Sequence, residues 1–216
     1  MQIFHPSLNT IAKATIFGGL FVLAAGAWAW DRLYRSAYVT QIDVVRNQPI
    51  PFSHEHHVRG LGIDCRYCHT SVETSSFAGI PATEICMSCH SLVWRDSPLL
   101  EPVRESFRTG KPLVWNRVHD LPDFVCFDHS IHLAKGIGCE SCHGRVEEMP
   151  LMRRAHSLQM KWCLECHEHP ERHVRDKSDL FRSETPREKS RENRLTLVRQ
   201  FGIDRKQLLD CGICHR

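Results

Sequence analysis

Five copies of one short pattern, Cys-x-x-Cys-His, constrain this 216-residue chain more than any other feature. Two cysteines three residues apart lie on one side of a helical turn, so both sulfurs can reach the two vinyl groups of one porphyrin. The histidine that follows can bind the iron as its proximal ligand, which makes the pattern the attachment signature of c-type haem. In chain order, motifs one to five are Cys65/Cys68/His69, Cys86/Cys89/His90, Cys139/Cys142/His143, Cys163/Cys166/His167 and Cys211/Cys214/His215.

Zinc ribbons and disulfides are the competing explanations for paired cysteines. Motifs one and two begin 21 residues apart, a spacing that a zinc ribbon can use. Neither a zinc ribbon nor a disulfide pair requires a histidine directly after the second cysteine, and all five copies have one. The sequence therefore predicts five covalently bound haem c groups.

The composition fits a protein whose core is filled largely by cofactor. Apolar residues make up 42% of the chain, and part of them lie in one N-terminal run, which leaves a small supply for a soluble core. The net charge of +3 gives no reason to expect nucleic-acid binding. We expect a mostly α-helical and irregular multihaem cytochrome c, with an N-terminal transmembrane helix and a haem-packed extramembrane domain that has little regular secondary structure.

Residues 11–30 form the apolar run, and Lys13 is its one charged residue. Twenty helical residues span about 30 Å, the thickness of a bilayer core. The sequence from Ala25 to Ala27 resembles a signal-peptide cleavage site, so a removed leader is the alternative. We predict a single-pass anchor in the cytoplasmic membrane. The haem domain would lie on its periplasmic face, because c-type cytochromes are matured outside that membrane.

The chain also contains an internal repeat around motifs one and three. Phe52 and Phe127 each begin a Phe-x-His-x-x-His segment, followed by a glycine pair and then by the motif, at an offset of 74 to 77 residues. This predicts a duplicated two-haem unit with a fifth haem added at the end. The expected parts are a transmembrane anchor 11–30, a linker 31–51, a first two-haem unit 52–94, a connector 95–126, a second two-haem unit 127–170 and a basic extension 171–216 that carries the fifth haem.

Five proximal histidines leave each iron with an open sixth position. Histidines three residues apart share a helix face, so each Phe-x-His-x-x-His segment can serve two neighbouring haems. The predicted distal ligands are His54, His57, His129 and His132 from these segments, with His119 as the fifth. Two alternatives stay open. His56 could replace His57, and Met160 could be an axial thioether, ahead of Met87, Met149 and Met152.

Some residues have no predicted part in haem binding. We expect Cys126, the one cysteine outside the motifs, to be a small buried residue. His156, His169 and His173 are expected to be solvated or hydrogen-bonded to propionates. The extension 171–216 carries the basic excess, and it is either a solvated tail or an arm that wraps a partner and delivers the fifth haem to it.

Four stretches of the chain, together with the order of its motifs, carry a family resemblance. The stretches are Gly62–Glu73, Val103–Ser106, Val118–Phe124 and Trp162–His167. They resemble the pentahaem cytochrome c subunit of alternative complex III, a quinol:electron-acceptor oxidoreductase, and the likeness covers nearly the whole chain. Cys126 departs from it, because an aromatic residue such as Tyr is expected there.

This resemblance implies an electron-transfer subunit rather than an enzyme in its own right. The implied partners in the complex are an iron–sulfur subunit related to molybdopterin enzymes, polytopic quinol-binding membrane subunits and a monohaem cytochrome c subunit. Electrons would pass to a soluble cytochrome c, a blue-copper protein or a terminal oxidase, in a respiratory or photosynthetic chain. The alternative function is that of a stand-alone, small, membrane-anchored multihaem quinol dehydrogenase.

Overall fold

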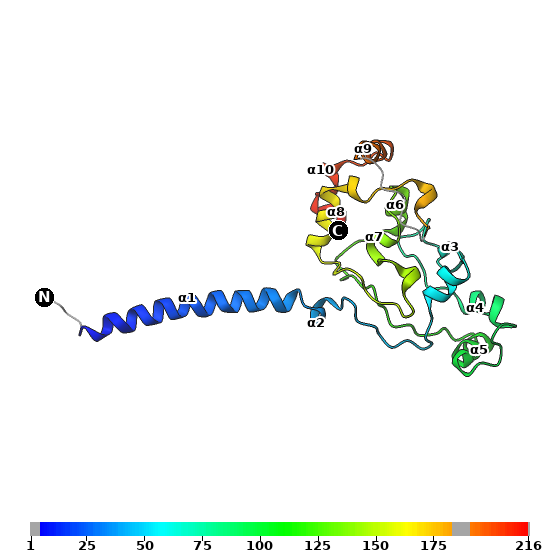
Figure 1. The fold of residues 1–216 in the computed structure, drawn as a ribbon, viewed down its shortest axis with the longest axis horizontal. Helices are drawn as coiled ribbons and strands as arrows, with labels where there is room; N and C mark the ends of the chain where they lie inside the picture. The colour runs from blue at the N-terminus through cyan, green and yellow to red at the C-terminus, as the bar shows by residue number, and fades with distance from the viewer. Residues whose placement is uncertain (1–4, 183–190, 216) are drawn as a thin grey trace. The chain divides into compact units, whose positions relative to one another are not determined.

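A computed structural model describes residues 5–182 and 191–215 of the chain. These residues are helical and irregular, as predicted, and they contain no β-strand (Figure 1). Extended backbone pairs only at two isolated bridges, Val45–Arg153 and Ile137–Val174. The chain divides into two compact units, one up to residue 42 and one from residue 43 onwards.

The first unit consists of α1 (Ser7–Tyr34) followed by the short helix α2 (Ala37–Thr40). None of the residues of α1 is buried, and the helix is long and apolar enough to cross a membrane, although a signal sequence would pass the same test. It extends four residues beyond the apolar run 11–30 at each end. At its C-terminal end, Arg35 pairs with Asp31 at 2.8 Å, one turn back along the helix.

The second unit is built from short helices joined by loops. In chain order these elements are η1 (Glu55–Gly60), α3 (Cys65–Cys68), α4 (Thr83–His90), η2 (Pro98–Leu100), α5 (Glu101–Thr109), α6 (His129–Ala134), α7 (Glu140–His143), η3 (Val146–Glu148), α8 (Met160–Glu168), η4 (Pro170–Arg172), η5 (Lys177–Asp179), α9 (Arg191–Gln200), α10 (Arg205–Leu208) and α11 (Cys211–Cys214). Each of the five Cys-x-x-Cys-His motifs lies in or beside one of these helices. An aspartate before the helix accepts a hydrogen bond from a first-turn N–H in α3, α6, α10 and α11, which stabilises these very short elements.

Residues 43–51, predicted as part of the linker, pack on the second unit. The N–H of Asp43 donates to the carbonyl of Arg154 at 2.9 Å, and its carboxylate pairs with Arg153 at 3.0 Å. Gln48 and Asn116 exchange hydrogen bonds between this segment and the connector. The free part of the predicted linker is therefore shorter than the sequence suggested.

The protein core is small, as expected for a chain whose centre is reserved for cofactors. One cluster of buried apolar residues contains Val72, Leu133 and Leu180, and a second contains Val174, Leu197 and Val198. The first cluster joins both two-haem units, through Val72 and Leu133, to Leu180, and the second joins the second unit, through Ile137, to residues that follow it in the chain. Burial is otherwise mostly partial among the described residues.

The described part of the extension packs on its own chain. Helix α9 supplies Leu197 and Val198 to the second cluster, and Lys135 donates from Nζ to the carbonyl of Phe201 at 2.7 Å. The glycine Gly136 allows this approach, because a side chain there would meet the Phe201 ring and the Arg175 carbonyl. These contacts hold residues 191–203 against the second two-haem unit. The sequence analysis had allowed for either a solvated tail or an arm that wraps a partner.

Candidate haem sites

Motif one lies between motifs two and three in space. Burial raises the pKa of the Cys68 thiol, and the nearby Cys86 thiol of motif two raises it further. On the other side, the Cys139 thiol has the largest influence on the pKa of Cys65, which it lowers, so motifs one and three are neighbours. Free thiols that influence each other at this range belong to attachment sites packed side by side.

Motif four lies between motifs three and five. The pKa of the Cys142 thiol is raised to about 12, first by burial and then by the thiols of Cys166 and Cys163. Burial also raises the pKa of Cys163, followed by the effect of Cys214 in motif five. The five attachment sites therefore form a series in space, in the order two, one, three, four, five.

The ten motif cysteines are not equally enclosed. Eight of them are partly buried, whereas Cys89 of motif two and Cys211 of motif five are exposed. The exposure of these two cysteines follows from their place in the series, because motifs two and five are the ends and each has a neighbouring site on one side only. Cys89 still lies near motif one, since its thiol contributes to the raised pKa of Cys68, and its Sγ accepts a weak hydrogen bond from the Ser88 hydroxyl at 3.9 Å.

Three pairs of imidazole rings have their centres nearly the same distance apart. Two imidazoles bound to opposite sides of one iron, each through a metal–nitrogen bond of about 2 Å, have ring centres about 6 Å apart. The three observed separations between ring centres are 6.2 Å for His57 and His90, 6.3 Å for His129 and His143, and 6.4 Å for His132 and His167. Each pair joins one predicted distal histidine to one proximal histidine.

Most of these histidines also have a fixed orientation. Where Nδ1 donates to a backbone carbonyl, the Nε2 atom is left unprotonated and available to a metal. Four proximal histidines donate in this way, to carbonyls at 2.7 to 3.0 Å: His69 to Gly79, His90 to Val93, His167 to Leu208 and His215 to Phe124. Three predicted distal histidines do the same at 2.6 to 2.8 Å: His57 to Ser53, His132 to Asp128 and His129 to Ser76.

These carbonyl acceptors were not predicted from the sequence. A carbonyl is present at every residue, so nothing in the amino-acid pattern marks Gly79, Val93 or Leu208 as an acceptor. The acceptors for His57 and His132 are a partial exception, because each lies four residues before its histidine, one helical turn away.

A cluster of buried histidines lies around motif three. Burial lowers the pKa of His143 to about 3, and His119, His129, His69 and His54 add to this effect through their own charge. Burial likewise lowers the pKa of His54 and of His119 to about 4. Three ring nitrogens of the cluster are buried without a hydrogen-bond partner among the described residues, namely His54 Nδ1, His119 Nε2 and His143 Nδ1. Of these atoms, Nε2 of His119 is the one that could bind a metal, whereas Nδ1 of His54 and of His143 lacks a carbonyl acceptor of the kind that His69 and His129 have.

For motifs one and five, the predicted distal ligands His54 and His119 do not form a ring pair of this spacing with their proximal histidines. After burial, the largest influence on the pKa of His54 comes from His69, so these two rings lie near each other. His119 has its ring 4.3 Å from that of His143, at 76°, and not against His215. The ring of His215 stacks instead on Phe124, with centres 5.9 Å apart. Among the described residues, no histidine ring is found opposite that of His215.

The two copies of the internal repeat have nearly the same local geometry. In the first copy, the Phe52 ring stacks on His57 at 4.4 Å and meets His54 edge-on at 4.9 Å. In the second copy, Phe127 makes the equivalent contacts with His132 at 4.5 Å and with His129 at 4.8 Å. A shared phenylalanine thus fixes the angle between the two histidines of each copy.

The two alternative ligands His56 and Met160 are exposed, and the centre of the His56 ring lies 5.5 Å from that of the His57 ring. The ring of His56 is exposed and stacks on Trp94, with centres 6.3 Å apart. The side chain of Met160 is 63% exposed. His156 stacks on Trp162, and His169 lies 3.7 Å from the buried carboxylate of Glu171.

Cys126 is exposed, and the expectation of a buried side chain was wrong. Its backbone rather than its thiol makes the contact: the N–H donates to the carbonyl of Cys214 at 2.7 Å. This hydrogen bond fastens motif five to the connector. Any residue except proline could make this backbone hydrogen bond, so the departure from the expected aromatic residue leaves it intact.

Comparison with known proteins gives one informative match. No protein-family model matches the chain. Over 132 residues, or 60% of its length, the chain is 38% identical to the multiheme cytochrome c subunit of menaquinone reductase from Nitratidesulfovibrio vulgaris strain Hildenborough. The match spans 58% of that relative's length. The similarity is therefore to a multihaem cytochrome that is a subunit of a quinone oxidoreductase.

Proposed function

We propose that this chain is a membrane-anchored c-type cytochrome with five covalently bound haems that carries electrons within a quinone oxidoreductase complex. The observation that carries the proposal is the set of three histidine pairs whose ring centres lie 6.2, 6.3 and 6.4 Å apart. Each pair has the spacing of two axial ligands on one iron. When bound, haem c supplies reversible one-electron transfer, and bis-histidine ligation closes the iron to other ligands.

We assign the side chains that hold each haem from the motifs and from the ring pairs. The cysteines of each motif form the two thioethers, the exposed Cys89 and Cys211 included, and the axial pairs are His54/His69, His57/His90, His129/His143, His132/His167 and His119/His215. The last pair rests on the buried, unpartnered Nε2 of His119 and on its place five residues before Phe124, whose carbonyl orients His215. It requires the His119 ring to turn from motif three towards motif five.

The order of attachment sites sets the path of electrons along the chain. Because the thiols of successive sites lie close together, the path runs through motifs two, one, three, four and five. The two ends of the path, motifs two and five, are then the places where other redox centres connect. Helix α1 anchors the chain in the cytoplasmic membrane, and the second unit lies on the periplasmic face, where c-type haem is attached.

The sequence resemblance assigns the complex to the alternative complex III type. Electrons would then come from quinol, through polytopic membrane subunits and an iron–sulfur subunit, and leave through a monohaem cytochrome c subunit, a soluble cytochrome c, a blue-copper protein or a terminal oxidase. The matched relative supports a second candidate, because it is named as a subunit of a menaquinone reductase. A complex of that kind would pass electrons in the opposite direction, into the quinone pool.

The test is to isolate the complex from membranes with the full chain in place. Mass spectrometry of the chain should show five haem additions, and the optical and paramagnetic-resonance spectra should show low-spin haem. Fewer than five haems would refute the cofactor assignment. Reduction of the haems by quinol and re-oxidation by a periplasmic carrier would support the first direction. Quinone reduction from a reduced carrier would support the second. Rapid reduction of the purified chain alone by quinol would contradict both and indicate the stand-alone quinol dehydrogenase.

A further inference from the structure

One loop after motif one, residues 71–79, contacts histidines of two different haem sites. The carbonyl of Gly79 accepts a hydrogen bond from Nδ1 of His69, the proximal histidine of motif one, at 2.7 Å. The carbonyl of Ser76 accepts one from Nδ1 of His129, a predicted distal histidine in the second two-haem unit, at 2.8 Å. Such bonds orient a ring and leave its Nε2 atom to a metal. The same loop therefore orients one ligand in each two-haem unit.

The backbone and the core also tie the loop to the second unit. The N–H of His129 donates to the same Ser76 carbonyl at 3.2 Å, and the next N–H along the chain donates to the carbonyl of Ser75 at 3.2 Å. Val72, near the start of the loop, is buried and packs with Leu133 of α6. A displacement of the loop would therefore move His129 with it.

The internal repeat shows how much these two histidines depend on the loop. His54 has the place in the first copy that His129 has in the second, and His143 corresponds to His69 in the same way. The Nδ1 atoms of His54 and His143 are buried without a hydrogen-bond partner among the described residues. In the proposed axial pairs, His54 lies opposite His69 and His143 opposite His129. The haems of motifs one and three, here haems one and three, would each have one ligand that this loop orients and one without a carbonyl acceptor.

Two serine side chains brace the loop from within. The Ser71 hydroxyl donates to the carbonyl of Phe77 at 2.8 Å, and the Ser75 hydroxyl accepts from the N–H of Phe77 at 3.2 Å. Phe77 lies between the two acceptor residues, Ser76 and Gly79, in the chain. Gly79 has a φ of 83°, and a Cβ there would lie 2.9 Å from Oγ of Ser71. Ser71 is therefore the side chain that holds both acceptor carbonyls in place.

We propose that residues 71–79 are a shared positioning loop that sets the axial ligation of haems one and three together. The proposal rests on the proposed function and its axial pairs, and it names the element that couples two neighbouring haems. A carbonyl that accepts from Nδ1 makes the imidazole a stronger donor to the iron. A stronger donor favours ferric iron, so two hydrogen bonds to one loop set two reduction potentials at once.

The experiment removes the brace and leaves every ligand in place. The complex is isolated with Ser71→Ala in the full chain, and redox titration followed by paramagnetic resonance gives the haem potentials. The signals of haems one and three are identified by their loss in His54→Ala and His129→Ala. We expect both potentials to rise, with an increase of up to about tenfold in each equilibrium constant for reduction, the worth of one hydrogen bond. Ser91→Ala, an exposed serine directly after motif two, should change no potential.

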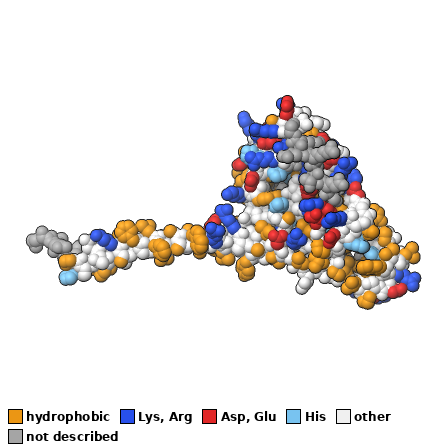
Figure 2. All heavy atoms as spheres, viewed as in Figure 1, with side chains coloured by type: hydrophobic (Ala, Val, Ile, Leu, Met, Phe, Trp, Pro, Cys, Tyr) orange, Lys and Arg blue, Asp and Glu red, His pale blue; other side chains and the backbone are white. Residues whose placement is uncertain are grey.

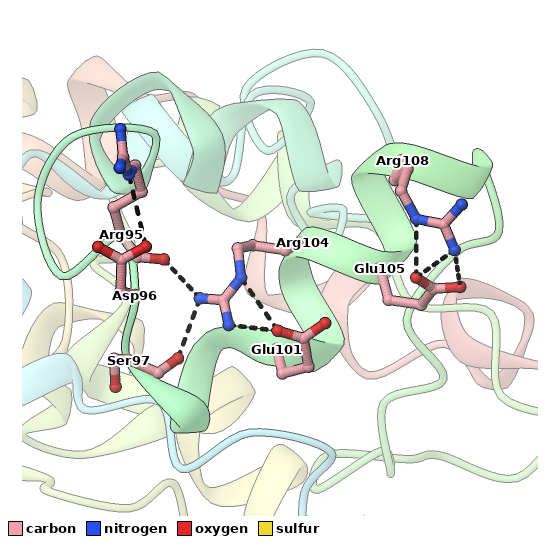
Figure 3. Close-up of polar contacts among 7 residues, drawn as sticks. All are labelled: Arg95, Asp96, Ser97, Glu101, Arg104, Glu105 and Arg108. Carbon is pink, nitrogen blue, oxygen red and sulfur yellow. Dashed lines mark hydrogen bonds and ion pairs between the residues drawn. The ribbon is translucent and has the colours of Figure 1, made fainter.

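The loop after motif two supplies a second comparison, because it orients one histidine only, His90, through the carbonyl of Val93. Helix α5 braces this loop, and Figure 2 shows basic and acidic side chains side by side where Figure 1 places α5. Nη1 of Arg104 donates to the carbonyls of Arg95 at 2.6 Å and Ser97 at 2.9 Å (Figure 3). Arg104→Lys keeps the charge but cannot span both carbonyls as a guanidinium does. It should shift the potential of the motif-two haem alone.

A second variant in the loop and the wild type complete the test. Gly79→Ala pushes a Cβ against Ser71 and should shift the same two potentials as Ser71→Ala. If neither loop variant changes these potentials, or if only one haem responds, the loop does not couple the two sites and the proposal is wrong. A shift of haem one or three in Arg104→Lys would contradict it as well, because the response would not be specific to this loop. Fewer than five haems in the wild-type complex would instead refute the proposed function.

Discussion

The two copies of the two-haem unit have the same histidine geometry but different surroundings. The stacking distance from phenylalanine to the second histidine is 4.4 Å in one copy and 4.5 Å in the other. In the second copy, the turn at Gly136 and Ile137 is covered by Phe201 and neighbouring residues from later in the chain. In the first copy, the equivalent Gly62 has open space around it. The two copies thus share the geometry around the histidines, whereas residues from later in the chain cover this turn in only one of them.

This difference shows that a repeat can meet two requirements, ligand binding and stability, independently of each other. Axial ligation depends on a short segment, because the phenylalanine and the two histidines lie within six residues. Stability depends on long-range contacts, and at the turn before the motif these come from α9 and Phe201 in the second copy alone. Away from that turn, Val72 of the first copy packs with Leu133 and Leu180. The copies should therefore respond alike to changes at the histidines and differently to changes at the turns.

The largest effect is expected at the histidines. Replacing His57 or His132 with Ala should convert one haem to high spin in either copy, while all five haems stay attached through their thioethers. The measurement is the optical and paramagnetic-resonance spectrum of the purified complex. His56→Ala is the matched control, because that ring is exposed and stacks on Trp94. If both variants keep an all-low-spin spectrum, the ligand assignment is wrong.

The shared geometry was accessible from the sequence, and the pairing of rings was not. Histidines three residues apart after a phenylalanine predict two ligands on one short segment, and in both copies the phenylalanine packs on both histidine rings. The assignment of His57 to His90 and of His132 to His167 depends on how distant helices pack, which the local pattern does not encode. The position of His119 against His143 depends on packing in the same way. The exposure of Cys126 was missed because its backbone, not its side chain, makes the contact.

The fold class was predictable for a physical reason. Five motifs and a small apolar supply leave little chain for strands, and the described residues of the second unit form short helices around the motifs. Nothing in the sequence indicates that the two ligand segments differ in backbone form, with a π-helix at Glu55–Gly60 and an α-helix at His129–Ala134. The sequence also did not indicate that the extension packs on the second copy, because the extension is mostly polar and basic. Leu197 and Val198 of the extension make these contacts, and they are two apolar residues among many charged ones.

A smaller effect is expected at the two glycine turns, where the copies should diverge. Gly62 and Gly136 each precede their motif by three residues and have positive φ, at 69° and 81°. Gly62→Ala should cost only the left-handed backbone strain, about 1 to 2 kcal/mol. Gly136→Ala should cost about 1 to 3 kcal/mol more, because its Cβ would meet the Arg175 carbonyl at 2.8 Å. Thermal unfolding followed by circular dichroism measures both, and equal losses would show that the covering of the second copy contributes nothing.

The smallest expected difference concerns the residues that begin the two ligand segments. In the second copy, Asp128 Oδ1 accepts from the N–H of Ile131 at 3.2 Å and from the Ser130 hydroxyl at 2.6 Å. In the first copy, the Ser53 hydroxyl accepts from the N–H of His56 at 3.1 Å. Replacing Asp128 or Ser53 with Ala should cost about 1 kcal/mol in either case. Only the aspartate cap can depend on pH.

The hydrogen bond from Ser130 lowers the pKa of Asp128 below its usual value, and the bond from the Ile131 N–H adds to this. Because the folded-state pKa is the lower one, the stabilisation is present above the unfolded-state pKa and is lost as the pH falls through the folded-state value. The wild type should therefore be more stable than Asp128→Asn at pH 6, and this advantage should shrink at about pH 3. The deficit of Ser53→Ala should be the same at both pH values, since a hydroxyl does not titrate there. A pH-independent advantage over Asp128→Asn would mean that the charge of this cap adds nothing, and the two copies would then be equivalent at their caps as well as at their histidines.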